Sequence, residues 1–473
     1  MKTKNKTRNS YDYDLAILGG GSAGYAAART ATDAGLKTVL IDGGSELGGL
    51  CILRGCMPSK ALLYAAEVLH LARVAKTWGL KIPQAGFDFK AVMARKREMV
   101  EEFACYRRGQ LTGGKFKLLR AQAGFVDGHT LALRQPPGSS PKSVTAKNFI
   151  VSTGSMPAPP PLPELRELGY LTSDEALSLS RLPRSLIVLG GGLVAVELAQ
   201  FFCRFGVKVT VIQRSRHLLR ECDEDVGATL EKVFRGEKIQ LHTDTRLRGV
   251  FRKGREKGIV FESGARIKRV AAEEILVALG RVPATAGLGL ENIGVQTENG
   301  RIVTNSSMQT AAPHVYAAGD CTGPHQIVHI AVEQGEIAAG NIIHPAKKRQ
   351  IDYRLLCSVA FTDPQVAVAG LTEKEAKARQ IAYLAASYLF NDHGKSIIMG
   401  VKHGFVKLLA DPRSGEILGG ACVGPAAGEL IHEIIAAMRH HMTAGELAVM
   451  PHYHPTLAEI WTYPASELAE KIK

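Results

Sequence analysis

The residue types best suited to redox chemistry gather in residues 48–60, where Cys51 and Cys56 stand five positions apart just after a glycine-rich loop. The N-terminus lacks the apolar stretch of a secretory signal, so we expect a cytoplasmic location in which thiols stay reduced. In that setting a close cysteine pair is more often catalytic than structural. Two buried thiols or half of a metal site are the alternatives, but no second ligand pair follows nearby. The segment therefore predicts a redox-active dithiol, and we expect no metal site.

A glycine fingerprint, Gly19-x-Gly21-x-x-Gly24, lies upstream of the cysteines, between a predicted strand at residues 14–18 and a helix-forming stretch. In such a loop the first glycine makes the tight turn and the second lets the backbone approach a pyrophosphate. The third lets the helix and the strand pack closely, and the helix N-terminus then faces the negative charge. This pattern predicts a dinucleotide site.

The same pattern returns in residues 185–195, with Gly190 and Gly192 at the first two positions and Ala195 at the third. Alanine is still small enough for close packing of the helix on the strand. The internal repeat therefore predicts a second βαβ dinucleotide unit.

Each predicted unit continues with a second strand whose last residues distinguish between nucleotides. These strands are predicted at residues 38–41 and 208–212. The first ends in Asp42, where a carboxylate accepts a ribose hydroxyl, whereas the second ends in Gln213 and is followed by Arg214 and Arg220. A carboxylate at this place favours NAD, and arginines can neutralise the 2′-phosphate of NADP. We therefore expect NADPH at the second site, with NADH as the alternative.

The composition is that of an ordinary globular chain of two or three domains, with 473 residues and 45% hydrophobic content. The formal net charge is +14, but basic stretches such as residues 252–255 and 266–269 have no aromatic interleaving and match no nucleic-acid module. We interpret them as solvated faces and expect no nucleic-acid partner. The longest apolar runs, such as residues 275–279, are strand-sized, so we expect no membrane span, which needs about 20 residues.

Five prolines between residues 157 and 163 stop both helix and sheet, and they indicate a domain boundary before the second unit. From about residue 350 no further glycine fingerprint appears, and strands alternate with helices. This part of the chain predicts a third domain, of the α+β class.

Together, these motifs resemble the class I pyridine nucleotide-disulfide oxidoreductases, the flavoenzyme family of dihydrolipoamide dehydrogenase, glutathione reductase and mercuric reductase. The resemblance covers nearly the whole chain. Residues 150–155 look like the family's Ala-Thr-Gly segment, residues 310–320 like its second FAD contact, and residues 452–459 like its His-Pro-Thr motif. It implies an α/β fold with two Rossmann-like domains, for FAD and NAD(P)H, and a C-terminal α+β dimerisation domain. The implied division is a disordered basic tail at 1–10, an FAD-binding domain at 11–157 and 286–349, an NAD(P)H-binding domain at 158–285, and a dimerisation domain at 350–473.

The resemblance also implies an electron relay from NADPH through the flavin to a Cys51–Cys56 disulfide. Cys51 would attack the substrate, and Cys56 would lie against the flavin. A nearby imidazolium and a helix N-terminus would favour the thiolate that both roles require.

A proton shuttle completes the relay, and the resemblance assigns it to His454, with Glu459 orienting the ring. Disulfide exchange needs such a shuttle near neutral pH, where histidine titrates. In this family the histidine reaches the cysteines of the other subunit, which implies an obligate homodimer. Lys60 and Glu197 match the family's ion pair near the flavin, with ordinary surface charges as the alternative.

The cofactor-binding residues implied by the resemblance fall into two sets. For FAD they are Gly19, Gly21, Ser22, Ala23, Gly24, Asp42, Gly49, Cys51, Lys60, Ala123, Thr153, Gly154, Gly319, Asp320, Ile327, Val328 and His329. For NAD(P)H they are Gly190, Gly192, Ala195, Glu197, Gln213, Arg214, Arg220 and Gly280.

The electron acceptor is the least determined part of the sequence. Segments such as residues 361–364 and 456–459 look most like dihydrolipoamide dehydrogenases, whereas Arg214 and Arg220 look like those of the NADPH-using glutathione and mercuric reductases. We therefore expect an NAD(P)H-dependent, FAD-containing reductase of a small-molecule disulfide, similar to dihydrolipoamide dehydrogenase. The alternatives are an NADPH-dependent enzyme like glutathione reductase or mercuric reductase, and a flavin redox sensor without steady turnover.

Overall fold

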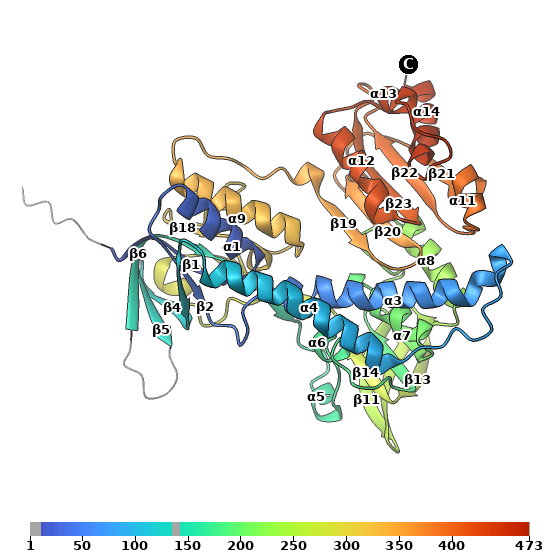
Figure 1. The fold of residues 1–473 in the computed structure, drawn as a ribbon, viewed down its shortest axis with the longest axis horizontal. Helices are drawn as coiled ribbons and strands as arrows, with labels where there is room; N and C mark the ends of the chain where they lie inside the picture. The colour runs from blue at the N-terminus through green and yellow to red at the C-terminus, as the bar shows by residue number, and fades with distance from the viewer. Residues whose placement is uncertain (1–10, 135–141, 473) are drawn as a thin grey trace, which may run out of the picture. The chain divides into compact units, whose positions relative to one another are not determined.

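The computed structural model describes residues 11–134 and 142–472 (Figure 1). The predicted basic tail, residues 1–10, lies outside this part of the chain. The chain forms two compact units, each assembled from three segments. The first unit comprises Met1–Met57, Arg97–Met156 and Arg281–Ile351, and the second comprises Pro58–Lys96, Pro157–Gly280 and Asp352–Lys473.

The first unit is built on a sheet around β1 (Tyr13–Leu18), which pairs in parallel with β2 (Thr38–Asp42) and β6 (Lys142–Val151). The other strands of this sheet are β3 (Lys117–Arg120), β4 (Gln122–Asp127), β5 (Thr130–Arg134) and β18 (Val315–Ala317). Their order is β3-β2-β1-β6-β5-β4, with β18 also paired in parallel to β6. Strand β5 pairs antiparallel with β4 on one side and with β6 on the other. Leu15 and Ile17 are fully buried, as expected for a parallel strand covered on both faces.

Two helices of the first unit, α1 (Ser22–Asp33) and α9 (Val328–Ile343), pack side by side (Figure 1). Small residues make this close approach possible. A Cβ at Gly335 of α9 would lie 2.3 Å from the carbonyl oxygen of Ala23 in α1. Shorter elements of the unit are α2 (Gly49–Arg54), β15 (Arg281–Pro283), η2 (Leu290–Ile293), β16 (Thr297–Glu298), β17 (Arg301–Ile302) and η3 (Asp320–Thr322).

Three elements run from one unit into the other along the chain. They are α3 (Cys56–Val74), α4 (Phe89–Thr112) and β7 (Ser155–Pro157).

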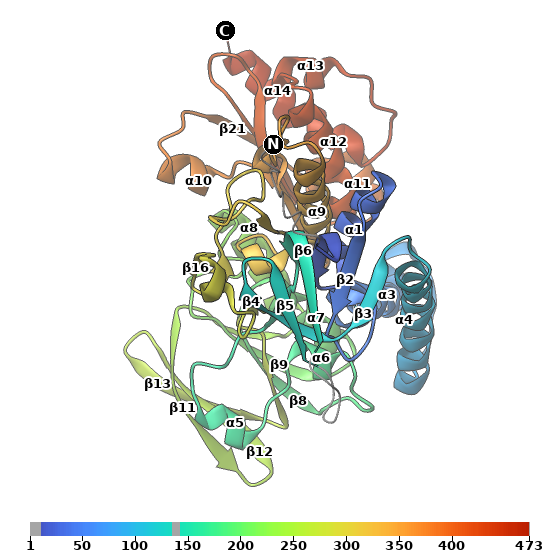
Figure 2. The ribbon, with the colours of Figure 1, turned by 90° about the vertical axis from the view of Figure 1, so that its left-hand side faces the viewer.

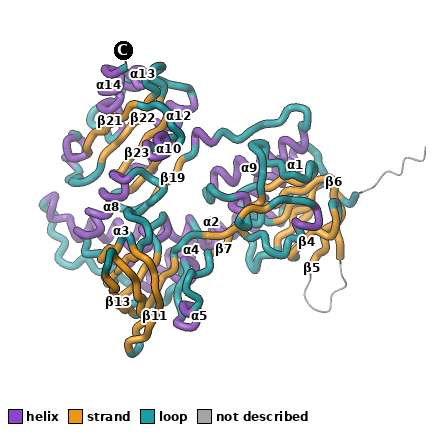
Figure 3. Tube along the Cα trace, turned by 180° about the vertical axis from the view of Figure 1, so that it is seen from behind, coloured by secondary structure: helices purple, strands orange, loops and turns teal. Residues whose placement is uncertain are grey.

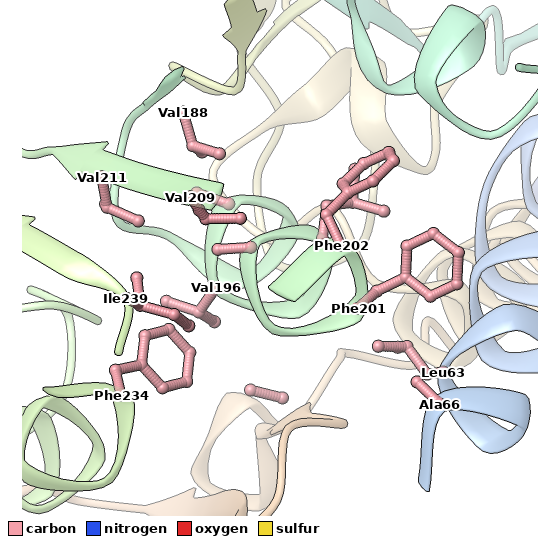
Figure 4. Close-up of a cluster of buried hydrophobic side chains, with 14 of the residues drawn as sticks. Leu63, Ala66, Val188, Val196, Phe201, Phe202, Val209, Val211, Phe234 and Ile239 are labelled. Carbon is pink, nitrogen blue, oxygen red and sulfur yellow. The ribbon is translucent and has the colours of Figure 1, made fainter. Parts of the chain in front are cut away.

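The second unit contains the second predicted nucleotide fold, a four-stranded parallel sheet of the described residues in the order β10-β9-β8-β14. Its strands are β8 (Ser185–Leu189), β9 (Lys208–Ile212), β10 (Gln240–His242) and β14 (Glu274–Val277), and its helices are α7 (Leu193–Arg204) and α8 (Glu224–Gly236). Phe201 and Phe202 of α7 are buried in its core, and Leu63 and Ala66 of α3 belong to the same hydrophobic cluster (Figure 4). Both predicted second strands, at residues 38–41 and 208–212, are confirmed.

An antiparallel sheet of β11 (Thr245–Lys253), β12 (Glu256–Ser263) and β13 (Arg266–Ala272) extends this nucleotide fold (Figure 2). Its inner face carries Ile259 and Phe261, both fully buried. The basic residues of the predicted stretches lie in β11, β13 and the turn at Gly254. Further short elements of the unit are η1 (Ala75–Trp78), α5 (Glu164–Leu168) and α6 (Ser173–Ala176).

The C-terminal segment of the second unit forms an antiparallel sheet in the order β19-β20-β23-β22-β21, with helices beside it (Figure 3). Its strands are β19 (Cys357–Ala360), β20 (Gln365–Gly370), β21 (Leu384–Leu389), β22 (Phe405–Ala410) and β23 (Ile417–Gly424). Its helices are η4 (Tyr353–Leu355), α10 (Glu373–Ala378), η5 (Phe390–Asp392), α11 (Gly394–Ile398), α12 (Ala427–Arg439), α13 (Ala444–Val449), η6 (Ala458–Trp461) and α14 (Thr462–Lys471). Trp461 is fully buried in the core and donates its indole N–H to the carbonyl oxygen of Leu430. The predicted α+β class of this segment is confirmed.

None of the described helices combines the length and the apolar character that crossing a membrane requires.

Candidate active site

The turn between β1 and α1 has the geometry that the first fingerprint predicts. Gly19 has φ +105°, and a Cβ there would lie 2.3 Å from the carbonyl oxygen of Ser152. A Cβ at Gly24 would lie 1.9 Å from the carbonyl oxygen of Gly19. Gly21, by contrast, meets no described atom within 4 Å of the Cβ position, so there is free space on this side of the turn. Two glycines are therefore required by packing, and the third leaves room for an approaching phosphate at a helix N-terminus.

The turn between β8 and α7 repeats this arrangement. Gly190 has φ +123°, and a Cβ there would lie 2.3 Å from the carbonyl oxygen of Ala278. Gly192 again meets no described atom within 4 Å. Ala195, at the third position, is fully buried. The internal repeat of the sequence is thus a repeat of backbone geometry.

Asp42 lies at the end of β2 and is held in place from several sides. Its Oδ2 accepts the N–H of Gly20 at 2.8 Å, and its Oδ1 accepts the N–H of Gly44 at 3.0 Å and a guanidinium N–H of Arg120 at 2.8 Å. An ionised carboxylate offers about four acceptor positions, so Oδ2 keeps capacity for a further donor such as a ribose hydroxyl.

The corresponding place in the second fold is occupied by Gln213, which is buried against the glycine turn. Its Oε1 accepts the N–H of Arg214 at 3.0 Å. The side chains of Arg214 and Arg220 are exposed, and Arg220 pairs with Glu221 at 2.7 Å on the surface. An exposed ion pair of this kind is weak and leaves the guanidinium available to an anionic ligand.

The second FAD segment predicted from the sequence is joined to the first by side-chain hydrogen bonds. Ser155 donates its hydroxyl to Asp320 Oδ2 at 2.6 Å, and Arg281 donates Nε–H to Ser155 Oγ at 2.8 Å. Gly319, with φ +79°, donates its N–H to Gln334 at 2.7 Å. This network fixes the segment beside the end of β6.

The residues present fit a dinucleotide in the first unit. The hydroxyl oxygen of Thr153 is buried and has no hydrogen-bond partner among the residues that the structure describes. A buried hydroxyl left without a partner costs free energy unless a ligand or water supplies one. Thr153 lies beside the turn, with its Cα 3.2 Å from the Cβ position of Gly19, so its hydroxyl is a polar group of the kind that FAD would satisfy.

The other residues predicted to bind FAD lie at the following places. Ser22 and Ala23 begin α1, Gly49 begins α2, Ala123 lies in β4, Gly154 follows β6 with φ +75°, and Ile327, Val328 and His329 lie at the start of α9. Of the NAD(P)H set, Gly280 precedes β15 and has φ +108°.

The two cysteines of the predicted dithiol are half-buried, Cys51 within α2 and Cys56 as the first residue of α3. Cys56 thus stands at the N-terminus of a 19-residue helix. Five other thiols are disfavoured as nucleophiles. Burial raises the pKa of Cys203 to about 11 and that of Cys222 and Cys321 to about 12, and it also raises the pKa of Cys357 and Cys422. These five thiols stay protonated near neutral pH.

Lys60 and Glu197, from α3 and α7, form an ion pair with Nζ 2.9 Å from Oε2. The Glu197 side chain is 6% exposed, and its Oε1 also accepts the N–H of Phe361 at 2.9 Å. The Lys60 ammonium lies 4.7 Å from the centre of the Phe361 ring. A buried carboxylate with a cationic partner and a backbone donor is well satisfied, so the geometry of this pair is fixed.

His454 and Glu459 are also brought together, with Nδ1 3.0 Å from Oε2. The His454 side chain is 77% exposed, and Glu459 is 12% exposed. Because Nδ1 donates to the carboxylate, Nε2 of His454 points away from that bond and is available to an external partner. The cysteines belong to the first compact unit, whereas Lys60, Glu197 and His454 belong to the second.

Sequence reasoning missed several residues of these clusters. Phe361 contacts the ion pair, Ser155 and Gln334 fix the second FAD segment, and His393 bonds to Glu459. Gln334 and His393 stand alone in their local sequence, so no spacing could indicate them. Ser155 and Phe361 lie within the segments 150–155 and 361–364 that carry the family resemblance, and that resemblance was the usable signal.

Two glycine turns of this geometry and a close cysteine pair in one chain are typical of enzymes that bind two dinucleotides and pass electrons to a dithiol. The fold and the clusters thus define the class of flavin- and nicotinamide-dependent dithiol oxidoreductases. Residues 13–335 match the family model of the pyridine nucleotide-disulphide oxidoreductases, and residues 356–465 match the dimerisation domain of the same family. The chain therefore belongs to the pyridine nucleotide-disulphide oxidoreductase family and carries its dimerisation domain, and membership implies FAD and a pyridine nucleotide as cofactors.

Curated relatives and solved structures agree with this assignment. The chain is 35% identical to the mercuric reductase of Streptomyces lividans over 94% of each protein. It is 34% identical to a dihydrolipoyl dehydrogenase of Bacillus subtilis, covering 95% of this chain and 96% of that one. LpdA from Mycobacterium tuberculosis superposes with a TM-score of 0.85 at 28% identity, over 96% of this chain and 99% of that one. The flavoprotein disulfide reductase RclA from Escherichia coli superposes equally well, with a TM-score of 0.85 at 25% identity over the same shares of the two chains. The predicted family, fold class and enzyme class are thus confirmed.

Proposed function

We propose that this protein is an NADPH-dependent reductase of small-molecule disulfides that works through Cys51 and Cys56, in the manner of dihydrolipoamide dehydrogenase. The observation that carries the proposal is the exposed His454, held at 3.0 Å by Glu459, in a chain that also has a paired-cysteine segment and two dinucleotide turns. A dithiol needs such a proton shuttle only when it exchanges with a disulfide whose leaving thiols must be protonated.

Two groups of residues would hold the two cofactors. FAD would be held by the turn at Gly19–Gly24, by Asp42, by Thr153 and Gly154, and by the segment at Gly319 and Asp320. NADPH would be held by the turn at Gly190–Ala195, with Gln213, Arg214 and Arg220 around the 2′-phosphate. The chemistry that bound FAD supplies is transfer of an electron pair from nicotinamide hydride to a disulfide.

The chain's own residues then carry out disulfide exchange. The thiolate of Cys51 attacks one sulfur of the substrate, forming a mixed disulfide and displacing one thiolate, which takes a proton from His454. His454, now neutral, accepts the proton of the Cys56 thiol. The Cys56 thiolate attacks the sulfur of Cys51, and the second displaced thiolate takes that proton from His454, which leaves a Cys51–Cys56 disulfide. One disulfide is reduced and one is formed, and Glu459 stabilises the imidazolium form of His454 that precedes each protonation.

The domain division is part of the proposal. It places FAD binding at 11–157 and 286–349, NADPH binding at 158–285 and dimerisation at 350–473. A homodimer would bring His454 of one subunit to the cysteines of the other, and the family's dimerisation domain at residues 356–465 supports this arrangement. We further propose a cytoplasmic location, because the dithiol must be able to cycle.

A mercuric reductase or a glutathione reductase is the second candidate, favoured by the similarity to the Streptomyces lividans enzyme and by the exposed arginines after Gln213. Reaction with lipoamide, glutathione disulfide, aromatic disulfides, Hg(II) and quinones, each measured with NADPH and with NADH, distinguishes the candidates. We expect lipoamide or another small disulfide to be preferred and the C51S variant to lose that activity while it keeps quinone reduction. Preference for Hg(II), or disulfide reduction that survives C51S, contradicts the proposal.

A further inference from the structure

A second histidine, His393, bonds to the same carboxylate as His454. Its Nε2 lies 3.2 Å from Glu459 Oε1, while His454 Nδ1 lies 3.0 Å from Glu459 Oε2. Each carboxylate oxygen of Glu459 is therefore hydrogen-bonded to a different imidazole ring. The two histidines differ sharply in environment, because His393 is 0% exposed whereas His454 is 77% exposed.

The surroundings of His393 determine which nitrogen carries its proton. It lies in the turn between η5 and α11, and its Nδ1 is 2.8 Å from the hydroxyl of Ser396, a residue that is itself fully buried. Burial lowers the pKa of His393 below the ordinary value, although the Glu459 carboxylate acts in the opposite direction. A neutral ring satisfies both neighbours in one way: Ser396 donates to Nδ1, and Nε2–H donates to Glu459.

The ring is also fixed in place by its neighbours. The aromatic ring of Tyr463 stands edge-on to it, with centres 6.2 Å apart, and Tyr463 in turn stacks on Tyr388 with centres 4.0 Å apart. His393 cannot reach a substrate from a fully buried position, so it can act on the chemistry only through Glu459.

We propose that His393 is a positioning residue of the proton shuttle, which holds Glu459 Oε1 so that Oε2 faces His454 Nδ1. The carboxylate would otherwise be free to rotate about its last bond, and His454 would lose both its orientation and the partner of its imidazolium. This proposal rests on the proposed function, in which His454 protonates the leaving thiol.

Two amide substitutions separate the contacts of the His393 ring. In H393N the short amide lies near the position of Nδ1, where its oxygen can accept from Ser396, but it does not reach Glu459. In H393Q the longer amide places its nitrogen near the position of Nε2, where it can donate to Glu459. H441N serves as the matched control, since it removes a histidine from another histidine–glutamate pair, His441 and Glu416 at 2.7 Å, on the surface of the same segment. Thermal unfolding and NADPH-driven quinone reduction report on the integrity of each variant.

The informative readout is the rate at which prereduced enzyme reduces two different disulfides. Lipoamide releases a basic thiol that needs a proton, whereas a nitro-substituted aromatic disulfide releases a thiol that leaves readily as the anion. We expect H393N to slow lipoamide reduction at least about tenfold and to affect the aromatic disulfide less than about threefold, because general acid catalysis as a whole contributes about 10²- to 10⁴-fold. H393Q should recover most of the lipoamide rate, and H441N should match the unmodified enzyme.

A double-variant cycle with E459A completes the test. If His393 acts through Glu459, H393N/E459A is no slower than E459A alone. Equal rates for H393N and H393Q, equal losses with the two disulfides, or losses that multiply in the double variant overturn the role of His393. The proposed function fails separately, if the unmodified enzyme reduces neither disulfide through Cys51.

Discussion

Lys60 and Glu197 stand 137 positions apart in the sequence, yet Nζ of the lysine lies 2.9 and 3.0 Å from Oε2 and Oε1 of the glutamate. The pair ties α3, which begins at Cys56, to the helix that follows the second glycine turn. One ion pair therefore joins a helix that starts in the cysteine segment to a helix of the nucleotide fold.

Removing the charge of Glu197 should impair electron entry into the dithiol. In E197Q the amide keeps a hydrogen-bond acceptor for the N–H of Phe361, but Lys60 loses its counter-charge. We expect NADPH-driven reduction of the enzyme to slow about tenfold, with a loss of about 1–2 kcal/mol in unfolding free energy, since Lys60 is one-third exposed. Stopped-flow absorbance and urea unfolding measure the two effects. K60R, which keeps the charge, is the control, and an unchanged reduction rate in E197Q would show that the ion pair has no part in electron entry.

The arginines after Gln213 should determine the coenzyme preference. Replacing both in R214A/R220A removes the positive charge expected around the 2′-phosphate, so we expect KM for NADPH to rise at least about tenfold while KM for NADH stays within about twofold. Steady-state kinetics with both coenzymes measure the change. R255A removes an exposed charge in the turn after β11 and should leave both values unaltered. Similar losses with NADPH and NADH would show that the two arginines do not recognise the 2′-phosphate.

Subunit mixing tests whether His454 serves the cysteines of a second subunit. C51S and H454A should each be nearly inactive, since each lacks one part of every site. When the two variants are co-expressed and pair at random, half of the dimers contain one C51S subunit and one H454A subunit. In such a dimer, one of the two sites has both its cysteines and its histidine. We expect about a quarter of the unmodified disulfide reductase activity. A mixture no more active than the separate variants indicates that histidine and cysteines act within one subunit.

Protein stability should fall in mild acid because several half-buried histidines resist protonation. Burial lowers the pKa of His314, and the neighbouring His129 ring, with its centre 4.5 Å away, lowers it further. The unfolded chain then binds more protons than the folded one below the ordinary pKa of about 6.5, so the unfolding free energy decreases as the pH falls through that value towards the folded pKa. His70 and His242 act in the same direction.

The contribution of His314 can be separated with H314F, which keeps an aromatic ring against Phe149 but cannot titrate. We expect unfolding free energies measured from pH 5 to 8 to depend less steeply on pH in this variant between pH 5 and 6.5. Any constant loss that remains at pH 8 reports the lost contact with the carbonyl oxygen of Gly128. A slope identical to that of the unmodified protein contradicts the assignment.

The sequence predicts the local parts of this structure well, because glycine and strand patterns act over a few residues. Gly19 and Gly190 have positive φ in their own turns, and the strands predicted after the two helices, β2 and β9, lie where the pattern indicates. The pairing of Lys60 with Glu197 depends on packing between distant helices, and only the family resemblance indicated it.

Sequence patterns do not reveal a buried polar residue that stands alone in its segment. His393 lies alone in a turn, and its bond to Glu459 arises from the packing of that turn against η6. Lys407 likewise lies in the apolar strand β22 but is 3% exposed among Asp223, Asp225 and Glu373, whose hydrogen bonds raise its pKa. The spacing of these residues in the sequence predicts neither cluster.

The central claim, that Cys51 and Cys56 form the redox dithiol with different tasks, is tested most directly by anaerobic titration of FAD-loaded protein with NADPH. The account predicts a long-wavelength band from a thiolate beside the flavin, which persists in C51S and disappears in C56S. No band in the unmodified protein, or a band that survives in C56S, would contradict it.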